Sequence, residues 1–134
     1  MTRTDLDNFE KISGQLVGVY EEISLLSKKN PNDAVNKFKL SFINNILEKA
    51  NTYLGDHYRP FTDFSLFDSD SVPQNSDVVF IITQYLQSFE KFRADNTYDS
   101  YGKWFWKVKP NKGEKAHEDG YIHIATAKPK NLKE

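Results

Sequence analysis

The chain has 134 residues, 18 Lys and Arg against 19 Asp and Glu, and no cysteine. Its near-zero net charge gives no overall attraction to nucleic acid or to an acidic membrane surface, and the lack of cysteine excludes thiol catalysis, disulfides and cysteine-ligated zinc. Apolar residues make up a low 38%, but 10 Phe, 7 Tyr and 2 Trp supply large rings that can fill a core. The length predicts a single domain over 1–134.

The first predicted element is a helix from about Asp5 to Lys29, with Thr4 as its N-cap. Its apolar residues recur at steps of three and four, which is typical of a helix packed along its length. Gly14 and Gly18 lie four apart on this helix, and each costs it about 1 kcal/mol relative to alanine. We expect a close approach by another helix or an aromatic ring to compensate, so both glycines are predicted to be helix-packing positions.

The segment "NPND", residues 30–33, predicts the start of a second helix, because Asn30 can cap and Pro31 fits the first helical position. This helix is expected to run to about Leu54, with Gly55 as the residue that follows its end. The short link predicts an antiparallel pair with the first helix. Its broad apolar side is made of Val35, Phe38, Leu40, Phe42, Ile43, Ile46, Leu47, Ala50, Tyr53 and Leu54.

Residues 56–76 lack a sustained period, but Phe61, Phe64 and Phe67 recur every third residue and predict a short helical turn against the bundle. A third helix is then expected from a cap at Asn75 or Ser76 to about Asp95. Its apolar face is the widest of the three and comprises Val78, Ile81, Ile82, Tyr85, Leu86, Phe89 and Phe92.

After residue 102 the apolar period changes to two, which indicates strands. "KWFWKV", residues 103–108, and "YIHIATA", residues 121–127, predict a hairpin with a long polar loop between them. A lone hairpin is marginal in water, so one face must pack on the helices or on a partner. The predicted fold class is therefore α+β, mainly α: a three-helix bundle over 1–97, followed by a two-stranded β-hairpin and basic tail over 98–134.

The stretch "KWFWKV" allows two interpretations. On a strand, Trp104 and Trp106 share the face predicted to be core. The opposite face carries Phe105 among lysines, and it is the predicted interaction surface: Lys103, Phe105, Lys107 and Lys109. An aromatic among lysines can stack a base and bind phosphates, but lysine stems also cover aromatics and protect edge strands. We favour the structural use, in which these lysines meet acidic residues such as Asp63, Asp68 or Asp70.

The sequence gives little support for a metal site or a catalytic motif. Counted from Asp68, an EF-hand loop would need Gly and Glu where Pro73 and Val79 stand. His117 and His123 flank Glu118 and Asp119, a carboxylate–imidazole combination, but nothing in this spacing makes three ligands converge. His57 stands apart from them in sequence. No phosphate loop or nucleophile elbow occurs, so we predict no catalytic residue, no metal site and no cofactor.

Charge is unevenly distributed along the chain. Residues 56–102 hold three basic and eight acidic residues, whereas residues 103–134 hold eight Lys and four acidic residues. The two segments can complement each other within one chain or between chains. The N-terminal residues "MTRTDLDNFEKIS" lack the apolar run of a secretory signal, so the expected location is cytoplasmic and no membrane partner is expected.

These patterns lead to three hypotheses for function. The first is a non-catalytic protein–protein interaction or scaffold module, either a homodimer with a helical interface or a subunit that binds another protein. The second is a nucleic-acid-binding module that uses the basic hairpin. The third is an enzyme whose site has no sequence motif.

Overall fold

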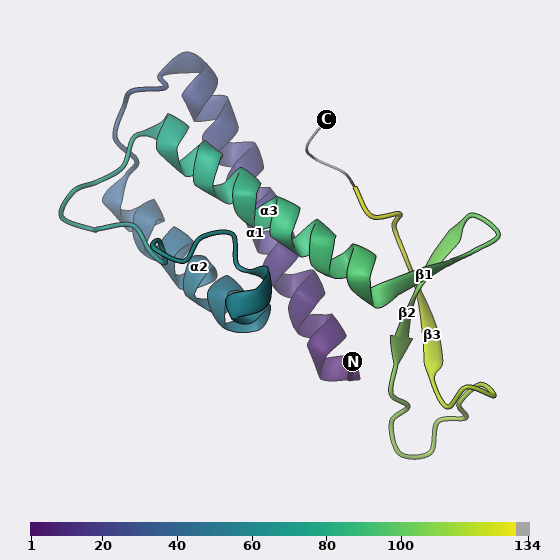
Figure 1. The fold of residues 1–134 in the computed structure, drawn as a ribbon. Coiled ribbons are helices and arrows are strands. Elements are labelled where there is room, and N and C mark those ends of the chain that lie inside the picture. The colour runs from purple at the N-terminus through teal and green to yellow at the C-terminus, as the bar shows by residue number, and fades with distance from the viewer. Residues whose placement is uncertain (131–134) are drawn as a thin grey trace.

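The computed structural model describes residues 1–130 and contains three helices followed by three strands (Figure 1). The elements are α1 (Arg3–Lys29), α2 (Lys37–Tyr58), α3 (Asn75–Asn96), β1 (Thr97–Ser100), β2 (Lys103–Val108) and β3 (Ile122–Thr126). The predicted class, α+β and mainly α, is confirmed. The predicted two-stranded hairpin is corrected to a three-stranded antiparallel sheet in the order β1-β2-β3. The end of the predicted basic tail, residues 131–134, lies outside the described residues.

α1 begins two residues earlier than its pattern suggests, because Thr2 and not Thr4 is the N-cap. The Thr2 hydroxyl accepts from the Asp5 backbone N–H at 3.1 Å, and the Asp5 carboxylate accepts from the Thr2 backbone N–H at 2.9 Å. This reciprocal capping box satisfies two donors that a helix start otherwise leaves unpaired. α1 then buries Leu6, Phe9, Ile12, Leu16 and Ile23.

The predicted start of the second helix is wrong, since Asn36 rather than Asn30 caps α2. Its side chain accepts from the backbone N–H groups of Phe38 and Lys39 at 2.8 and 3.2 Å. Residues 30–36 instead pair with the segment that leads into α3. The Val35 N–H donates to the Pro73 carbonyl at 2.9 Å, for example, so the backbone of this link is satisfied by tertiary contacts.

α2 passes through a kink at Gly55, which has φ of +64°. The sequence predicts a helix end at this residue, and the backbone does leave helical geometry there before one further turn to Tyr58. The inward side of α2 is made of Leu40, Ile43, Leu47, Ala50 and Leu54. Phe38 and Phe42, which the sequence pattern predicts on the same broad apolar side, lie outside it and are exposed.

The segment between α2 and α3 has no helical turn, which corrects the prediction for Phe61, Phe64 and Phe67. The three rings form a chain of edge contacts, with centroids 6.0 and 5.1 Å apart. The side chain of Asn44 on α2 holds the segment in place, because it donates to the Phe67 carbonyl and accepts from the Phe67 N–H, both at 2.9 Å. α2 therefore anchors this segment through an amide as well as through apolar contact.

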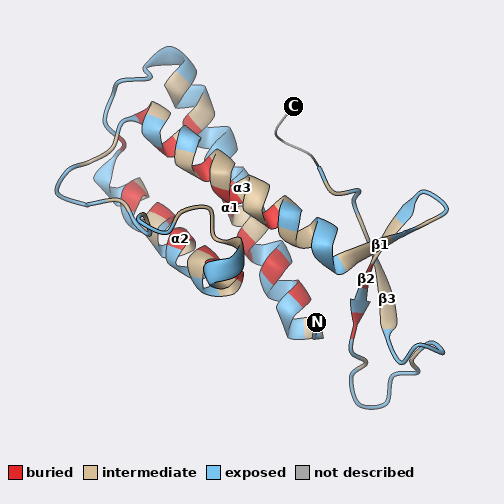
Figure 2. Ribbon diagram, in the orientation of Figure 1, coloured by how far each residue is buried: buried red, intermediate tan, exposed pale blue. Residues whose placement is uncertain are grey.

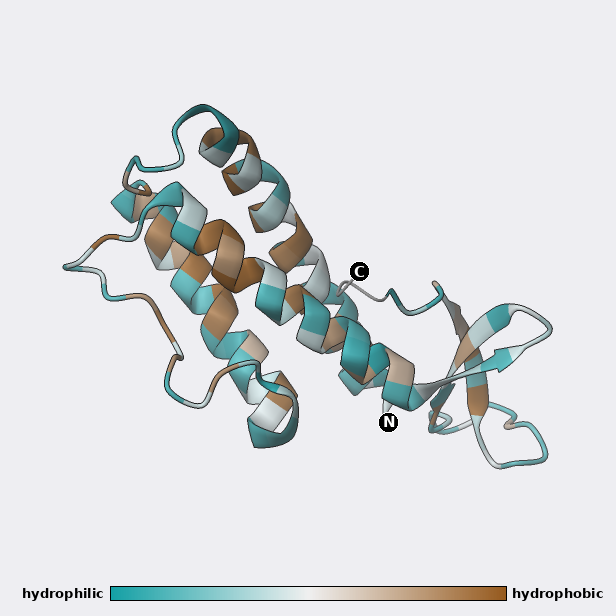
Figure 3. Cartoon of the chain, turned by 45° about the horizontal axis from the view of Figure 1, so that its top comes forward, coloured by the Kyte–Doolittle hydropathy of each residue, from teal (hydrophilic) through white to brown (hydrophobic). Residues whose placement is uncertain are grey.

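α3 leads straight into the sheet. Its N-cap is Gln74, which forms a capping box with Asp77. The predicted cap at Asn75 or Ser76 is therefore wrong by one or two residues. The apolar bands of the three helices face one another (Figure 3). The buried residues follow these inward faces, whereas the long β2–β3 loop is mainly exposed (Figure 2).

The sheet attaches to the bundle through one of its faces. Trp106 and Val108 are fully buried, and the Trp106 ring lies 4.9 Å from that of Phe9 on α1. The backbone N–H of Lys109 donates to the Met1 carbonyl at 2.9 Å, which ties the end of β2 to the start of the chain. Trp104 is only half-buried, so its prediction as a core residue equal to Trp106 is corrected.

Candidate functional site

β2 displays the predicted interaction surface, because its alternation puts Lys103, Phe105 and Lys107 on the face away from Trp106. The lysines are exposed, but Phe105 is half-buried. Its cover is Tyr98 of β1, the residue directly opposite it in the register, and the two rings stack at 5.7 Å. Phe105 is therefore not the freely exposed aromatic that the sequence predicts; it forms half of an aromatic pair.

Lys107 has an acidic neighbour on this face, but not one of the predicted ones. Its Nζ lies 3.5 Å from the Asp119 carboxylate and 5.3 Å from the centroid of the Tyr98 ring. Asp63, Asp68 and Asp70 lie in the α2–α3 segment. The amino group of Lys107 thus bridges a carboxylate from the long loop and an aromatic face, which holds the loop against the sheet.

Tyr98, His123 and Asp119 form a hydrogen-bonded chain on the same face. The Tyr98 hydroxyl is hydrogen-bonded to His123 Nδ1, and His123 Nε2 lies 2.9 Å from Asp119 Oδ2. The rings of His117 and His123 are 4.5 Å apart. The structure therefore brings together His117, His123 and Asp119, as the carboxylate–imidazole pattern suggests, whereas His57 lies by Tyr58 at the end of α2.

Asp119 is held as a carboxylate in this chain. Partial burial raises its pKa, but the Tyr121 backbone N–H, at 3.0 Å, His123 and Lys107 together outweigh that effect and lower the pKa below its ordinary value. No group of three or more His, Cys, Asp and Glu side chains in residues 1–130 is arranged to hold a metal ion.

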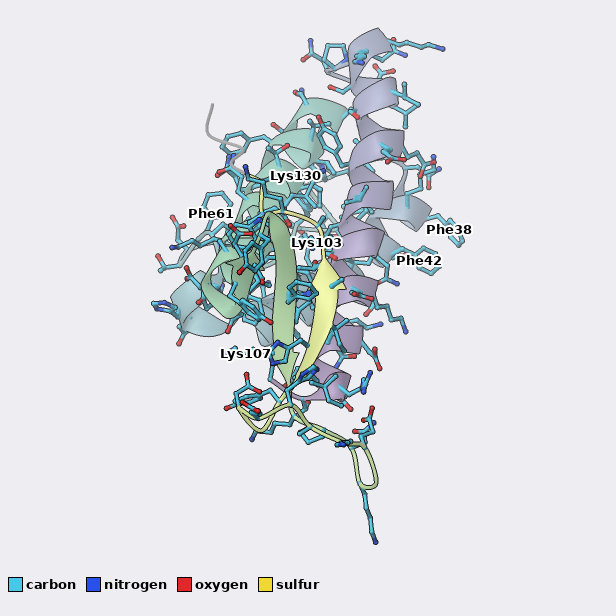
Figure 4. The ribbon with its side chains drawn as sticks, turned by 90° about the vertical axis from the view of Figure 1, so that its right-hand side faces the viewer. Phe38, Phe42, Phe61, Lys103, Lys107 and Lys130 are labelled. Atoms are coloured by element: carbon cyan, nitrogen blue, oxygen red, sulfur yellow. The ribbon has the colours of Figure 1, made fainter. Side chains whose placement is uncertain are left out.

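A second surface lies on the outer flank of the α1–α2 pair. Phe38 is 72% exposed and Phe42 56% exposed, and their rings meet edge to face at 5.0 Å. They project from the molecule beside α1, on the opposite side from Phe61 (Figure 4). A salt bridge between Glu22 of α1 and Lys39 of α2, at 2.7 Å, joins the two helices at this point.

Gly14 and Gly18, the predicted helix-packing positions, are exposed on α1. Gly18 precedes Glu22 by one turn of α1, and Phe42 follows Lys39 by about one turn of α2, so each lies one turn from the Glu22–Lys39 ion pair. A Cβ atom built on Gly14 or Gly18 would meet no atom of the described residues within 4 Å. The expected close approach by another helix or an aromatic ring therefore has no partner within residues 1–130. We define the α1–α2 flank as Gly14, Gly18, Leu25, Phe38 and Phe42.

Two hollows lie on the surface of residues 1–130, apart from the sheet face described above. One, of about 620 Å³, lies between α3 and the α2–α3 segment and is lined by Phe64, Phe67 and Phe80 among others. The other, of about 410 Å³, is a groove between α1 and α2 and is lined by Gln15 and Lys49 among others. Neither of these two hollows is lined by Tyr98, His123 or Asp119.

Comparisons with protein-family models, with curated proteins and with solved structures found no match to this chain. None of the helices in residues 1–130 is long and apolar enough to cross a membrane.

Proposed function

We propose that the chain is a non-catalytic protein–protein interaction module that self-associates through the α1–α2 flank. The observation that carries this proposal is the exposed Phe38–Phe42 pair. Aromatic side chains are enriched in the buried centres of protein interfaces, and two adjoining rings on one helix form a compact apolar patch. α2 already contributes five other side chains to the core, so these rings are not needed to fill it.

The partner we propose for this flank is a second copy of the chain. The flank has projecting rings at Phe38 and Phe42 and, on the neighbouring helix, side-chain-free positions at Gly14 and Gly18. In a two-fold symmetric dimer the same patch of both molecules forms the interface. The Phe38 and Phe42 rings of each molecule can then cover Gly14 and Gly18 of the other. The groove beside it carries both Lys49 and Glu48, which lets opposite charges meet across the same axis.

Matched phenylalanine variants test this proposal. Phe38→Ser combined with Phe42→Ser should weaken self-association by about tenfold or more, since central aromatic residues dominate interface energies. Phe80→Ser is the control, because Phe80 is 59% exposed on α3, away from the flank. Size-exclusion chromatography with light scattering over a concentration series gives both results. Equal association by the double variant and the unaltered chain would overturn the assignment of the interface.

A second candidate function, nucleic-acid binding by the sheet, is favoured by one observation. The stacked pair of Tyr98 and Phe105 lies on the same sheet face as Lys103 and Lys107, an arrangement of the kind that stacks single-stranded bases and neutralises phosphates. The ion pair between Lys107 and Asp119 reduces the positive charge of this face, which is why we place self-association first.

A nucleic-acid binding assay distinguishes the two candidate functions. Sheet-based binding predicts micromolar or tighter affinity for single-stranded RNA or DNA that falls steeply with salt. It should be lost when Lys103 and Lys109 are changed to Glu, while Lys11→Glu on α1 should have little effect. No measurable binding at physiological salt would exclude the second candidate and leave the first unaffected.

A further inference from the structure

The Tyr98–His123–Asp119 chain spans the outer face of the sheet. Tyr98 is on β1 and His123 on β3, the two strands that flank β2, and their rings lie 5.3 Å apart and nearly perpendicular, at 84°. The Tyr98 hydroxyl meets the imidazole at its edge, because it is hydrogen-bonded to Nδ1. The sheet register holds the arrangement, because Tyr98 is paired with Phe105 and His123 with Lys107 on the shared central strand.

The hydrogen bonds determine which nitrogen of His123 carries the proton. Asp119 is an ionised carboxylate and accepts at 2.9 Å from Nε2, which must therefore bear a hydrogen. In the neutral ring Nδ1 is then unprotonated, and its lone pair accepts the hydrogen bond of the Tyr98 hydroxyl. Tyr98, His123 and Asp119 thus stand in the order nucleophile, base and orienting group that characterises an activated nucleophile.

We infer that Tyr98 is a base-activated phenol and a site of O-acylation by small activated acyl compounds. In the reaction the Tyr98 oxygen attacks the acyl carbonyl carbon while its proton passes to His123 Nδ1. The tetrahedral adduct then expels the leaving group, which takes that proton, and the products are an acyl ester of Tyr98 and the protonated leaving group. Asp119 is a positioning residue, since it acts only through the imidazole.

Three other tyrosine hydroxyls are hydrogen-bonded to acceptors other than imidazole. Tyr53 donates to the backbone carbonyl of Asp5, Tyr58 to the Asp95 carboxylate and Tyr85 to the Asn51 amide oxygen. Tyr101 is fully exposed in the turn that follows β1 and provides an internal reference for an accessible phenol of ordinary reactivity. Because Tyr98 is itself half-buried, accessibility alone would make it react more slowly than Tyr101.

Acetylation of the full chain by N-acetylimidazole, followed by peptide mass mapping, tests the inference. Tyr98 should be acetylated several-fold faster than Tyr101 in the same molecule. His123→Gln should lower the Tyr98 rate by about tenfold or more, within the range of general-base contributions, and leave the Tyr101 rate unchanged. His57→Gln is the matched control and should change neither rate. If Tyr101 reacts as fast as Tyr98 in the unaltered chain, the inference is wrong whatever the variants do.

The role of Asp119 has a separate readout. Asp119→Asn keeps an oxygen acceptor but removes the charge, so it should lower the ratio of the Tyr98 rate to the Tyr101 rate. Asp119→Glu restores the carboxylate and should recover part of that ratio. If Asp119→Asn leaves the ratio unchanged, the carboxylate does not position the base, and the three-residue assignment fails.

Discussion

Burial separates the two tryptophans of β2, although they share one face of the strand. Trp106 is fully buried against Phe9, whereas Trp104 is half-buried nearer the end of the strand. Trp106→Ala should therefore cost about 3–5 kcal/mol of unfolding free energy, because the lost ring leaves a cavity. Trp104→Ala is the matched comparison and should cost clearly less. Urea denaturation measures both, and equal losses would contradict the packing described.

The open surroundings of Gly14 and Gly18 change what substitution there should do. A methyl group at either position meets nothing within 4 Å in this chain, so Gly→Ala should raise the stability of the monomer by about 0.5–1 kcal/mol. Gly55→Ala is the control. It too has space for a methyl group, but φ of +64° makes alanine strained, so it should destabilise by about 1–2 kcal/mol. Thermal unfolding at low concentration compares the three variants.

At the scale of elements, the start of α1 depends on pH through its capping box. The Thr2 backbone N–H donates a hydrogen bond to the Asp5 carboxylate. This bond lowers the pKa of Asp5 more than partial burial raises it, and the Thr2 hydroxyl lowers the pKa further. A carboxyl with a lower pKa in the folded chain stabilises the fold above its unfolded pKa and loses this effect as pH falls through the folded pKa.

Asp5→Ala tests this dependence. At pH 7 the variant should be less stable by about 1 kcal/mol, as is usual when a helix cap is lost. The difference from the unaltered chain should shrink as pH is lowered from about 5 toward 2, since protonation removes the charged form of Asp5. Urea denaturation at several pH values measures it. A difference that is constant over this range would show that the carboxylate charge has no part in the cap.

The sequence predicts the helices and the β2–β3 pair well, because long periodic segments have strong patterns. β1 is missed since the hairpin turn to β2 is Tyr101–Gly102, with φ of 53° and 83°. Such turns usually carry Asn or Asp before Gly, and a tyrosine with positive φ gives no sequence signal. The start of α2 is missed for another reason. Asn30 and Pro31 have the local preferences of a helix start. Their segment instead forms backbone hydrogen bonds with residues 73–76, so the helix begins later.

The two candidate surfaces are only partly predictable from the sequence. The alternation of β2 correctly puts Lys103, Phe105 and Lys107 on one face. The stacking of Tyr98 on Phe105 depends on a strand that the sequence does not reveal. The exposure of Phe38 and Phe42 is equally hidden, because a wide apolar side does not say which residues face the core. Asn45 and Lys49 at the following turns mark the polar edge that could have suggested it.

Two copies of this chain should associate through the α1–α2 flank, and sedimentation equilibrium of the unaltered chain measures whether they associate. One chain has a mass of 15.6 kDa. At tens of micromolar and physiological salt we predict a mass close to twice that value, falling toward one chain on dilution. A mass that stays at a single chain over this concentration range would contradict the proposed function.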